Sequence, residues 1–564
     1  MSTKEIQKRF QQAICIIPAV MLFAAVGSLP YQYYTVLRIV VSIACVYMVF
    51  RAYRYYNNLA IILFISIAVL FNPLLPVSLS RNLWIPIDII SGILFLVSSF
   101  MFKKTQKSEI GNVKKNRRKK LFSKLIIASF IIGILAVLAG RQVWFAINGN
   151  ESLSGRQQNI PEPVKIKSPI EKGLADWPCW RGPDGDGKSK VTGIIKDWSN
   201  GLKKLWEINY LCQGDRNVSW SSVAVSGNRL VVPGRDNDND LIFCLDPENG
   251  DLIWVGSYKA DTGSSHGPGA RATAYIDEER VYTFGRSGDL ACWLLEDGRL
   301  LWRENVSHQG GQEPQWGHSC SPFVYQDKVI VQGGGQALII AYDKMTGKLI
   351  WKSMQGPAGY AATTSIDIDG SEKLLIFHGT GLSCLDPNDG TEIWSVGWKT
   401  SYEVNATTPA VFNDIIFITS GYNTGCQALK VSGDSIESLW KSKVIASHHS
   451  DPIIIDGFVY GYSGQSNQNK GKFKCVELET GKEMWSTNEI GWGTTVYVDG
   501  LLLCMDIKGN LFLVEPNPDK FRKVTEFKNA LGEVSDPAWT IPVVANGRLY
   551  LRYMQRLICY DIIP

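Results

Sequence analysis

A repeat that ends in tryptophan is the feature that most constrains how this chain folds. An eleven-residue motif begins with a small residue, turns through acidic residues and Gly, and ends in Trp, as in CLDPENGDLIW (244–254) and CLDPNDGTEIW (384–394). The closing tryptophans lie 43 to 49 residues apart, at Trp206, Trp254, Trp302, Trp351, Trp394, Trp440 and Trp485. Self-similarity with a period of this length is the signature of a repeat architecture.

Each repeat also contains a second recurrent strand, and together the strands predict a β-propeller. A degenerate eighth unit, LVEPNPDKFRKVTEF (513–527), ends in Phe527 in place of Trp. Stretches such as NRLVVPG and DKVIVQG recur in every unit, and alternating β-branched and aromatic residues bounded by turn residues are strand signals. Four short strands in each of eight units predict an all-β fold over 176–564, an eight-bladed β-propeller.

The two ends of the repeat region predict how the ring closes. LICYDIIP (557–564) is the first half of a motif without its Trp, and LKKLWEIN (202–209) is the second half without its hairpin. We therefore expect the N- and C-terminal strands to pair in one blade, which removes the free sheet edges. In each motif the Gly is expected to take a positive φ, and the Trp to pack on the next blade while donating its N–H to a backbone carbonyl.

The first 147 residues carry the apolar part of the chain, and they predict an α-helical membrane bundle. Five apolar stretches, each close to the roughly 20 residues that span a bilayer, lie at about 11–29, 34–50, 59–77, 83–102 and 121–140. Loops rich and poor in Lys and Arg alternate between them. The positive-inside rule then predicts a multi-pass protein of the bacterial inner (cytoplasmic) membrane, in contact with the lipid bilayer, with a cytoplasmic N-terminus and an extracytoplasmic propeller.

Two further features qualify this division. Asp88 is the one acid within a predicted span, which makes it a functional candidate, whereas its place close to the helix start favours an interfacial residue. The segment 148–175 is polar, contains Pro and Gly and shows no periodicity, so it is predicted to be a linker.

The net charge excludes one class of partner. The chain carries +5, but the run 103–120 alone contributes +8, so the remaining residues carry −3. No basic surface is indicated on the propeller, and nucleic acid is not an expected partner.

The mouth of the central channel is the expected ligand site, because the innermost strand of each blade lines that channel and ligands favour concave openings. Residues at equivalent positions before these strands are Trp220, Arg271, His318, Tyr360, Asn405, His448, His449, Trp492 and Trp539. Arg271 suits a carboxylate or phosphate, the His side chains suit titration near neutral pH or a metal, and the Trp and Tyr rings suit a flat ring or a sugar. The alternative is that these side chains fill a wet channel without binding a ligand.

No metal site is predicted. Three His without paired carboxylates do not match a standard site. The stretch DGDG (184–187) has Ile195 where an EF-hand loop needs Glu.

The cysteines of the repeat are predicted to be free. Cys244, Cys292, Cys384, Cys475 and Cys559 share one motif position, and equivalent strands of neighbouring blades lie too far apart for a disulfide. Cys179 and Cys212 fall outside this pattern, and their state is left open.

The Trp-closed repeat resembles that of the pyrroloquinoline-quinone (PQQ) repeat propellers, a superfamily that includes quinoprotein alcohol and sugar dehydrogenases and the outer-membrane assembly propeller. The lead-in DWPCWRGPDGDGKS (176–189) and the stretches GPGARATAYID (267–277), WGHSCSPFV (316–324) and HHSDPIIIDGFVYGYS (448–463) resemble a bacterial PQQ-like subgroup of mostly unassigned role. The first four apolar stretches resemble a small four-helix bacterial membrane module of uncharacterised role. The resemblance to the propellers covers 176–564.

Two functions follow as hypotheses. The first is a membrane-anchored extracytoplasmic binding or scaffold module for an envelope partner or a carbohydrate-like ligand. The resemblance implies the second, a quinoprotein-like dehydrogenase that uses PQQ with calcium, oxidises a sugar or alcohol and passes electrons to membrane quinone. A five-span anchor with an external propeller is the layout of the membrane-bound quinoprotein glucose dehydrogenases. The chain has neither the adjacent Cys-Cys pair of the alcohol dehydrogenases nor a Cys-x-x-Cys-His haem motif, and no catalytic residue is assigned.

Overall fold

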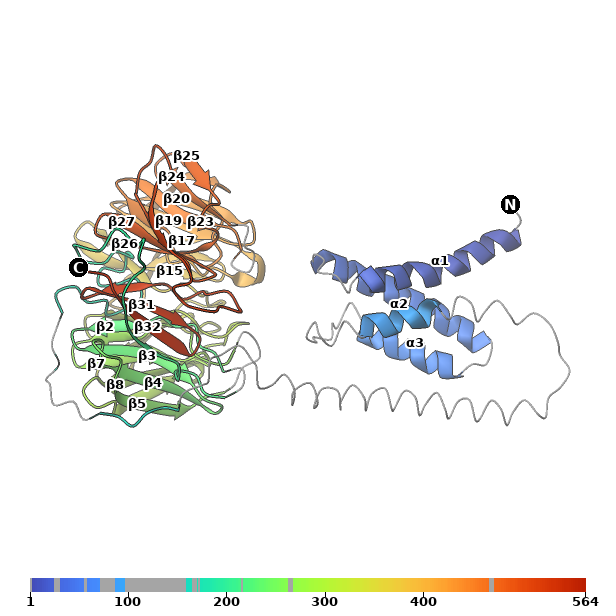
Figure 1. The fold of residues 1–564 in the computed structure, drawn as a ribbon, viewed down its shortest axis with the longest axis horizontal. Helices are drawn as coiled ribbons and strands as arrows, with labels where there is room; N and C mark the ends of the chain where they lie inside the picture. The colour runs from blue at the N-terminus through green and yellow to red at the C-terminus, as the bar shows by residue number, and fades with distance from the viewer. Residues whose placement is uncertain are drawn as a thin grey trace. The chain divides into compact units, whose positions relative to one another are not determined.

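The chain forms two compact units, residues 1–152 and 153–564, which we describe separately (Figure 1). The structure is a computed structural model. It describes residues 3–24, 31–54, 58–71, 87–96, 159–164, 170, 173–214, 217–261, 267–465 and 471–564.

The first unit is helical. Its elements are α1 (Thr3–Ala24), α2 (Tyr31–Arg54), α3 (Asn58–Leu70) and a further helical stretch at 87–96. Apolar side chains from all four segments form one core, in which the rings of Phe64 and Phe95 lie 5.4 Å apart and Asp88 is buried. This confirms an N-terminal helical part.

The described helices of this unit do not meet the length and apolarity that a bilayer crossing requires. The stretch predicted as the fifth span, 121–140, lies outside the described residues, as does part of the others. The five-span arrangement and its orientation therefore stay predictions.

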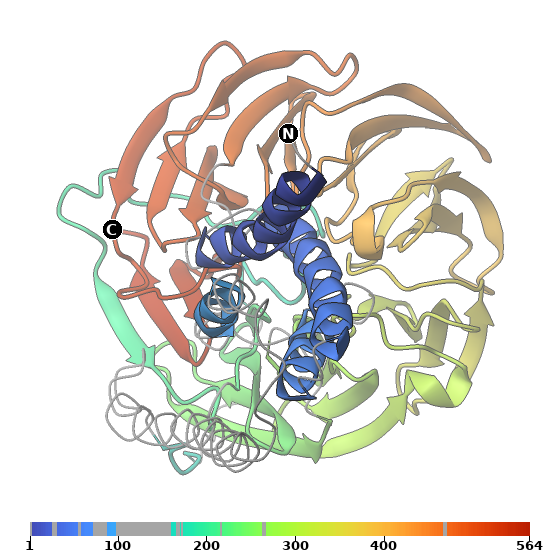
Figure 2. The ribbon, with the colours of Figure 1, turned by 90° about the vertical axis from the view of Figure 1, so that its right-hand side faces the viewer.

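The second unit consists of eight four-stranded antiparallel sheets in a ring, which confirms the predicted propeller (Figure 2). Seven blades take four consecutive strands. The first blade consists of β2 (Ala224–Ser226), β3 (Arg229–Arg235), β4 (Asn239–Leu245) and β5 (Leu252–Lys259), and the second of β6 (Tyr275–Asp277), β7 (Arg280–Phe284), β8 (Asp289–Leu294) and β9 (Leu300–Asn305). The third blade consists of β10 (Phe323–Tyr325), β11 (Lys328–Gln332), β12 (Ile339–Asp343) and β13 (Leu349–Ser353), and the fourth of β14 (Thr364–Ile368), β15 (Ser371–His378), β16 (Gly381–Leu385) and β17 (Glu392–Gly397). The fifth blade consists of β18 (Ala410–Phe412), β19 (Ile415–Ser420), β20 (Gly425–Ser432) and β21 (Ser435–Ser442). The sixth consists of β22 (Ile453–Ile455), β23 (Phe458–Ser463), β24 (Lys472–Glu477) and β25 (Glu483–Thr487), and the seventh of β26 (Gly493–Val498), β27 (Leu501–Asp506), β28 (Leu511–Val514) and β29 (Lys523–Phe527). Short 3-10 turns η1 (Val306–Gln309) and η2 (Ser401–Glu403) lie between blades.

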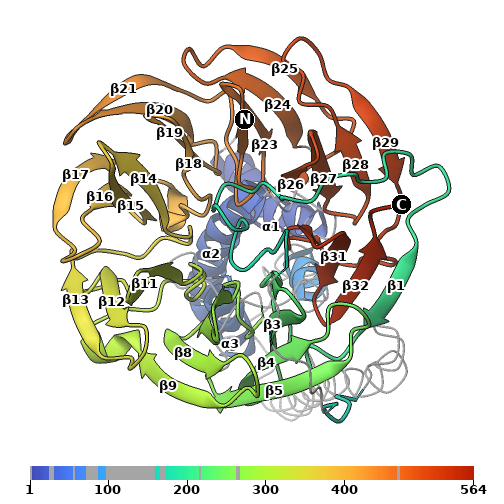
Figure 3. The same ribbon diagram turned by 90° about the vertical axis from the view of Figure 1, so that its left-hand side faces the viewer.

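The eighth blade joins the two ends of the repeat region, as the split motif predicts. Its strands, in sheet order, are β1 (Lys204–Ile208), β32 (Arg556–Asp561), β31 (Arg548–Tyr553) and β30 (Val543–Ala545). Trp206 of β1 lies opposite Cys559 of β32, the same Trp–Cys pairing that the first blade makes between Trp254 and Cys244. Figure 3 shows β1 beside β32 where the ring closes. β1 thus supplies the fourth strand of the blade that the three C-terminal strands begin.

The motif tryptophans connect neighbouring blades. Six of the seven donate the indole N–H to a backbone carbonyl of the next blade at 2.7–3.1 Å: Trp206, Trp254, Trp302, Trp351, Trp440 and Trp485. For five of these six, all except Trp485, a hairpin glycine of that next blade lies against the indole. Gly347, for example, has a φ of 72°, and a Cβ there would lie 2.7 Å from the Trp302 ring. The indole N–H of Trp394 is the exception, because the structure gives it no hydrogen-bond partner.

All twelve cysteines are free and buried. Cys179 and Cys212, whose state the sequence leaves open, are among them. Burial is the main cause that raises the pKa of the Cys179 thiol to about 12, so this thiol is protonated at neutral pH.

Part of the segment predicted to be a linker contacts the propeller. The Val164 N–H donates to the Leu252 carbonyl at 2.7 Å, and the Ala175 N–H donates to Asn546 Oδ1 at 3.0 Å. Ile160 and Ile170 pack against buried clusters of the propeller.

The segment 176–200, which we call the strap, then crosses the ring (Figure 3). Trp177 pairs with Val225 of the first blade, and Lys188 pairs with Tyr497 of the seventh. Between these points Arg181 forms an ion pair with Asp451 at 3.1 Å, and both side chains are almost fully buried. The strap therefore links the first, sixth and seventh blades across the interior of the ring.

Candidate functional site

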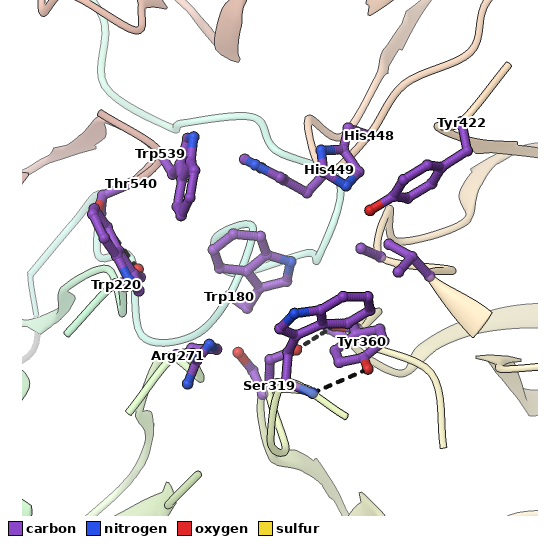
Figure 4. Close-up of a pocket in the computed structure, with 15 residues that line it drawn as sticks. Trp180, Trp220, Arg271, Ser319, Tyr360, Tyr422, His448, His449, Trp539 and Thr540 are labelled. Atoms are coloured by element: carbon purple, nitrogen blue, oxygen red, sulfur yellow. Dashed lines mark hydrogen bonds between the residues drawn. The ribbon is translucent and has the colours of Figure 1, made fainter. Parts of the chain in front are cut away.

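A cavity of about 330 Å³ lies at the centre of the ring, among the loops that lead into the innermost strands (Figure 4). Six of the nine candidate residues line it: Trp220, Arg271, Tyr360, His448, His449 and Trp539. The other lining residues are Trp180, Trp316, Ser319, Ser321, Ala362, Val404, Ala406, Tyr422 and Thr540. Equivalent positions of successive repeats thus meet at one mouth.

Hydrogen bonds between neighbouring entry loops hold this mouth in place. The backbone N–H of Trp220 donates to the Ala270 carbonyl at 3.1 Å, which links the first two blades. Ser319 Oγ donates to the Tyr360 carbonyl at 3.1 Å, and the Tyr360 N–H donates to the Asn405 carbonyl at 2.8 Å. The backbone that carries the lining side chains is therefore bonded from blade to blade.

Aromatic rings follow one another around the mouth. Adjacent ring centroids are 4.7 to 5.9 Å apart, a separation at which aromatic rings attract each other. In order, the members of this aromatic arc are Trp220, Trp539, His449, His448, Tyr422, Tyr402, Trp316 and Tyr360. The arc gives the pocket a nearly continuous wall of ring faces and edges.

Arg271 is the one cationic side chain in the described lining, and that lining contains no carboxylate. Its Nη2 donates to the Gly267 carbonyl at 3.4 Å. Burial, and then the charge of Arg286, lower the pKa of Arg271 to about 10, so the guanidinium is charged at neutral pH. Arg286 itself is held by Glu313 at 2.8 Å. The pocket can therefore offer charged N–H donors to a polar ligand.

Trp180 of the strap forms the base of the pocket. Trp220 precedes β2, whereas the strap pairs with Val225 inside β2, so the strap lies further along the innermost strands than the mouth does. The indole N–H of Trp180 donates to Thr408 Oγ1 at 3.0 Å and to Asp451 Oδ2 at 3.2 Å. Figure 4 shows its indole at the centre of the lining side chains.

Three candidate residues do not line the pocket, although they lie close to it. His318 is 2% exposed and packs on Phe284, Trp492 is fully buried with its ring centroid 5.0 Å from that of His449, and Asn405 is fully buried. Asn405 Nδ2 donates to the His378 carbonyl at 2.7 Å. These three residues lie buried next to the residues that line the pocket.

From the sequence, the His side chains were expected to titrate near neutral pH, but two of the imidazoles do not. Burial is the main cause that lowers the pKa of His318 to about 4 and that of His449 to about 3. The charge of His448 lowers the pKa of His449 further. Both rings are therefore neutral at pH 7, and the His449 ring acts as an aromatic contact between Trp492 and Trp539.

Several lining residues were not expected from the sequence. Trp180 and Trp316 stand outside the series of seven motif tryptophans, but so do the fully buried Trp198 and Trp398, so this position alone did not mark them as lining residues. Tyr422 lies in the turn between β19 and β20, and no repeat feature marks it.

The residues present do not fit PQQ with calcium. Among the described residues no group of three or more His, Cys, Asp or Glu side chains is arranged to hold a metal ion. Asp451, directly beneath the pocket, already accepts hydrogen bonds from Trp180 and from the Thr408 N–H and pairs with Arg181. No carboxylate in the described lining is therefore available to ligate calcium or to act as a base.

Comparison with known families supports the type of propeller. A family model described as outer membrane protein assembly factor BamB matches residues 238–487. A second model, described as a family of unknown function (DUF6804), matches residues 10–100. No curated protein matches the chain.

Similar solved structures are distant in sequence. BamB from Moraxella catarrhalis is 15% identical, with 64% of this chain and 98% of that chain covered and a TM-score of 0.47. A quinohemoprotein alcohol dehydrogenase from Comamonas testosteroni is 12% identical, with 69% and 81% covered and a TM-score of 0.47. The second unit is an eight-bladed β-propeller, and its residues 238–487 are similar to the PQQ-like repeats of the BamB family model. This resemblance does not assign an activity.

Proposed function

We propose that this PQQ-like β-propeller is a binding module that holds a carbohydrate-like ligand in the pocket at the centre of its ring. The observation that carries the proposal is the aromatic arc, in which side chains from six blades and their connecting loops surround one cavity. Trp and Tyr rings combine a wide apolar face with a polar edge. A pyranose ring has the complementary character, with C–H groups on its faces and hydroxyls around its rim.

The polar groups of the pocket suit the hydroxyls of such a ligand. Ser319 and Thr540 donate their hydroxyl protons to backbone carbonyls, so their oxygens can accept from a ligand. Ser321 Oγ accepts from the Thr273 N–H and can donate, and Arg271 adds charged donors. The volume of about 330 Å³ lies at the small end of the range for ligand pockets, about 300–1,000 Å³. The pocket therefore suits a single sugar ring, held by ring faces and a small number of hydrogen bonds.

The side chains of the pocket favour binding over chemistry. General acid–base catalysis needs a titratable group whose pKa lies near the working pH. Burial lowers the pKa of His449 to about 3 and raises the pKa of Tyr360 to about 12. Neither residue changes its charge near pH 7, and the described lining has no carboxylate, which leaves His448 as its one other imidazole.

Anchoring in the bacterial inner membrane, with the propeller outside the cytoplasm, is part of the same proposal. It rests on the apolar stretches and on the alternation of basic and non-basic loops, in particular the run 103–120 that precedes the propeller.

The proposal is tested by calorimetric titration of the full chain, in detergent, with mono- to tetrasaccharides of the cellulose, maltose and chitin series. We expect one series to bind, and Trp539→Ala to weaken its affinity by about tenfold or more, as for other buried aromatic anchors. The matched control is Trp302→Phe, because Trp302 is a motif tryptophan outside the pocket. Binding that is unchanged in Trp539→Ala, or no binding by any series, would overturn the proposal.

A further inference from the structure

Two consecutive residues at the rim of the pocket hold an unfavourable backbone. Tyr402 and Glu403 have φ angles of 62° and 60°, the left-handed region that side-chain-bearing residues avoid. Each residue in such a conformation costs on the order of 1–3 kcal/mol. Tyr402 is 57% exposed, so burial of this residue does not account for the cost.

The surrounding structure maintains this conformation. Asn405 Oδ1 accepts a hydrogen bond from Thr400 Oγ1 at 2.5 Å, while its Nδ2 donates to the His378 carbonyl at 2.7 Å. The Glu403 N–H donates to the Thr400 carbonyl at 3.1 Å. The loop is therefore fixed at both ends by a fully buried Asn, and it presents the Tyr402 ring at the surface.

The Tyr402 ring extends the pocket outward. It packs in T-shaped pairs with two lining residues, Trp316 and Tyr422, whose ring centroids are 5.8 and 5.6 Å away. Tyr402 itself does not line the cavity. The aromatic surface thus continues from the interior of the pocket to its rim at this one tyrosine of η2.

The base of the pocket is closed by the strap. The Trp180 indole is held there by Thr408 and Asp451, and Asp451 is held in turn by Arg181. A ligand longer than the pocket therefore cannot continue along the channel past Trp180, and it extends outward across the rim.

We propose that Tyr402 forms a second subsite, which takes the next ring of an oligosaccharide whose terminal ring fills the pocket. The site then recognises the end of a sugar chain and not an internal segment. This inference rests on the proposed function. It explains why a strained and exposed tyrosine stands between two lining aromatics.

The test compares affinities within one oligosaccharide series, measured by calorimetry on the full chain with the cellulose, maltose and chitin series from monomer to tetramer. In the series that binds, we expect the dimer to bind about tenfold more tightly than the monomer, a typical effect of one added aromatic contact. Tyr402→Gly is expected to lose this gain, and Tyr402→Phe, which keeps the ring, is expected to retain it.

The choice of glycine separates binding from folding. Gly adopts a positive φ without cost, so Tyr402→Gly is expected to melt no lower than the unmodified protein. Glu403→Gly is the matched control, because it relieves the same backbone strain next to Tyr402 and keeps the ring. We expect it to keep the full gain in affinity from monomer to dimer.

Each outcome distinguishes the two proposals. A gain that persists in Tyr402→Gly, or equal affinity for monomer and dimer, overturns the second subsite while the pocket remains a sugar site. No binding by any of the three series overturns the proposed function and the subsite with it.

Discussion

At the scale of single residues, the hydrogen bond of a motif tryptophan can be distinguished from the apolar area that its indole buries. Trp351 and Trp394 are each 8% exposed and occupy the same motif position, but only Trp351 donates its N–H to a carbonyl, that of Pro387 at 3.1 Å. The next blade after Trp394 turns at 432–435, without the acidic hairpin that supplies this carbonyl in the other repeats. Area burial and hydrogen bonding can therefore be compared within one molecule.

We expect Trp351→Phe to lower the free energy of unfolding by about 1–2 kcal/mol more than Trp394→Phe does. Both changes remove similar apolar area, but only the first leaves a buried carbonyl without its donor. Chemical denaturation followed by tryptophan fluorescence measures the difference, since 16 of the 18 tryptophans belong to the propeller unit. Equal losses in the two variants would show that the N–H bond adds nothing to the contact between blades.

Buried imidazoles should make the propeller sensitive to acid. Burial lowers the pKa of His318 and of His378 to about 4, whereas in the unfolded chain His titrates near 6.5. As the pH falls below about 6.5 the unfolded state takes up protons first, so stability present at pH 7 is lost down to about pH 4. We expect a loss of roughly 2 kcal/mol for each imidazole by pH 4.5.

Denaturation of the full chain at pH 7.0, 5.5 and 4.5 measures this loss. His378→Gln should flatten the pH dependence. His308→Gln is the control, because the His308 side chain is 68% exposed. A stability that is constant over this range would contradict the burial of these rings.

The sequence predicted which position of each blade the site residues occupy better than it predicted which of them face the pocket and which are buried. The repeat period assigns Trp220, Arg271 and Tyr360 to equivalent positions, and the structure places all three in the pocket lining. The same spacing included Asn405 and Trp492, which point into the protein. Depth depends on which groups a side chain can bond or pack against, as Asn405 does with the His378 carbonyl, and the period carries no information on that.

At the scale of elements, the strap is the part that the repeat could not predict. Its residues lie outside every motif, and its contacts join positions far apart in the chain, such as Arg181 with Asp451. The motif did predict the four strands of each blade and the tight hairpins. Local turn chemistry sets those features, whereas a single long crossing leaves no periodic trace in the sequence.

We expect the strap to depend on its buried ion pair. Asp451→Ala would leave the Arg181 guanidinium buried without its carboxylate, which typically costs about 3–5 kcal/mol. Adding Arg181→Met should restore part of the loss, because the buried charge is then removed. As the control, Asp184→Ala breaks the exposed pair with Lys190 in the same strap and should cost less than about 1 kcal/mol. If Asp451→Ala and Asp184→Ala cost the same, the strap is not held by this pair.

At the scale of the whole molecule, the ring is closed by its two ends. The sequence predicted this closure because each end carries the half of the motif that the other lacks, and the structure pairs β1 with β32. The sequence also predicted the helical character of the first unit, because its apolar stretches approach the length of a membrane helix. The five crossings and their orientation stay predictions.

A cross-link can test the closure. Glu207 of β1 lies directly opposite Ile558 of β32, and facing residues of antiparallel strands are close enough for a disulfide. We expect Glu207→Cys with Ile558→Cys to form one on mild oxidation. It should stabilise the fold by on the order of 4 kcal/mol, because it closes a very long loop. Glu207→Cys with Val524→Cys, on a different sheet, should not cross-link, and equal cross-linking of both pairs would contradict the closed ring.

The most direct test of the central claim, that the mouth of this ring binds a sugar chain by its end, is hydrogen–deuterium exchange of the full chain with and without the oligosaccharides of the three series. We predict that one series slows exchange in the loops that carry the aromatic arc, at 314–320, 400–406 and 446–452, and leaves the outer strands β9 and β13 unchanged. Protection confined to those outer strands, or none with any series, would contradict the account.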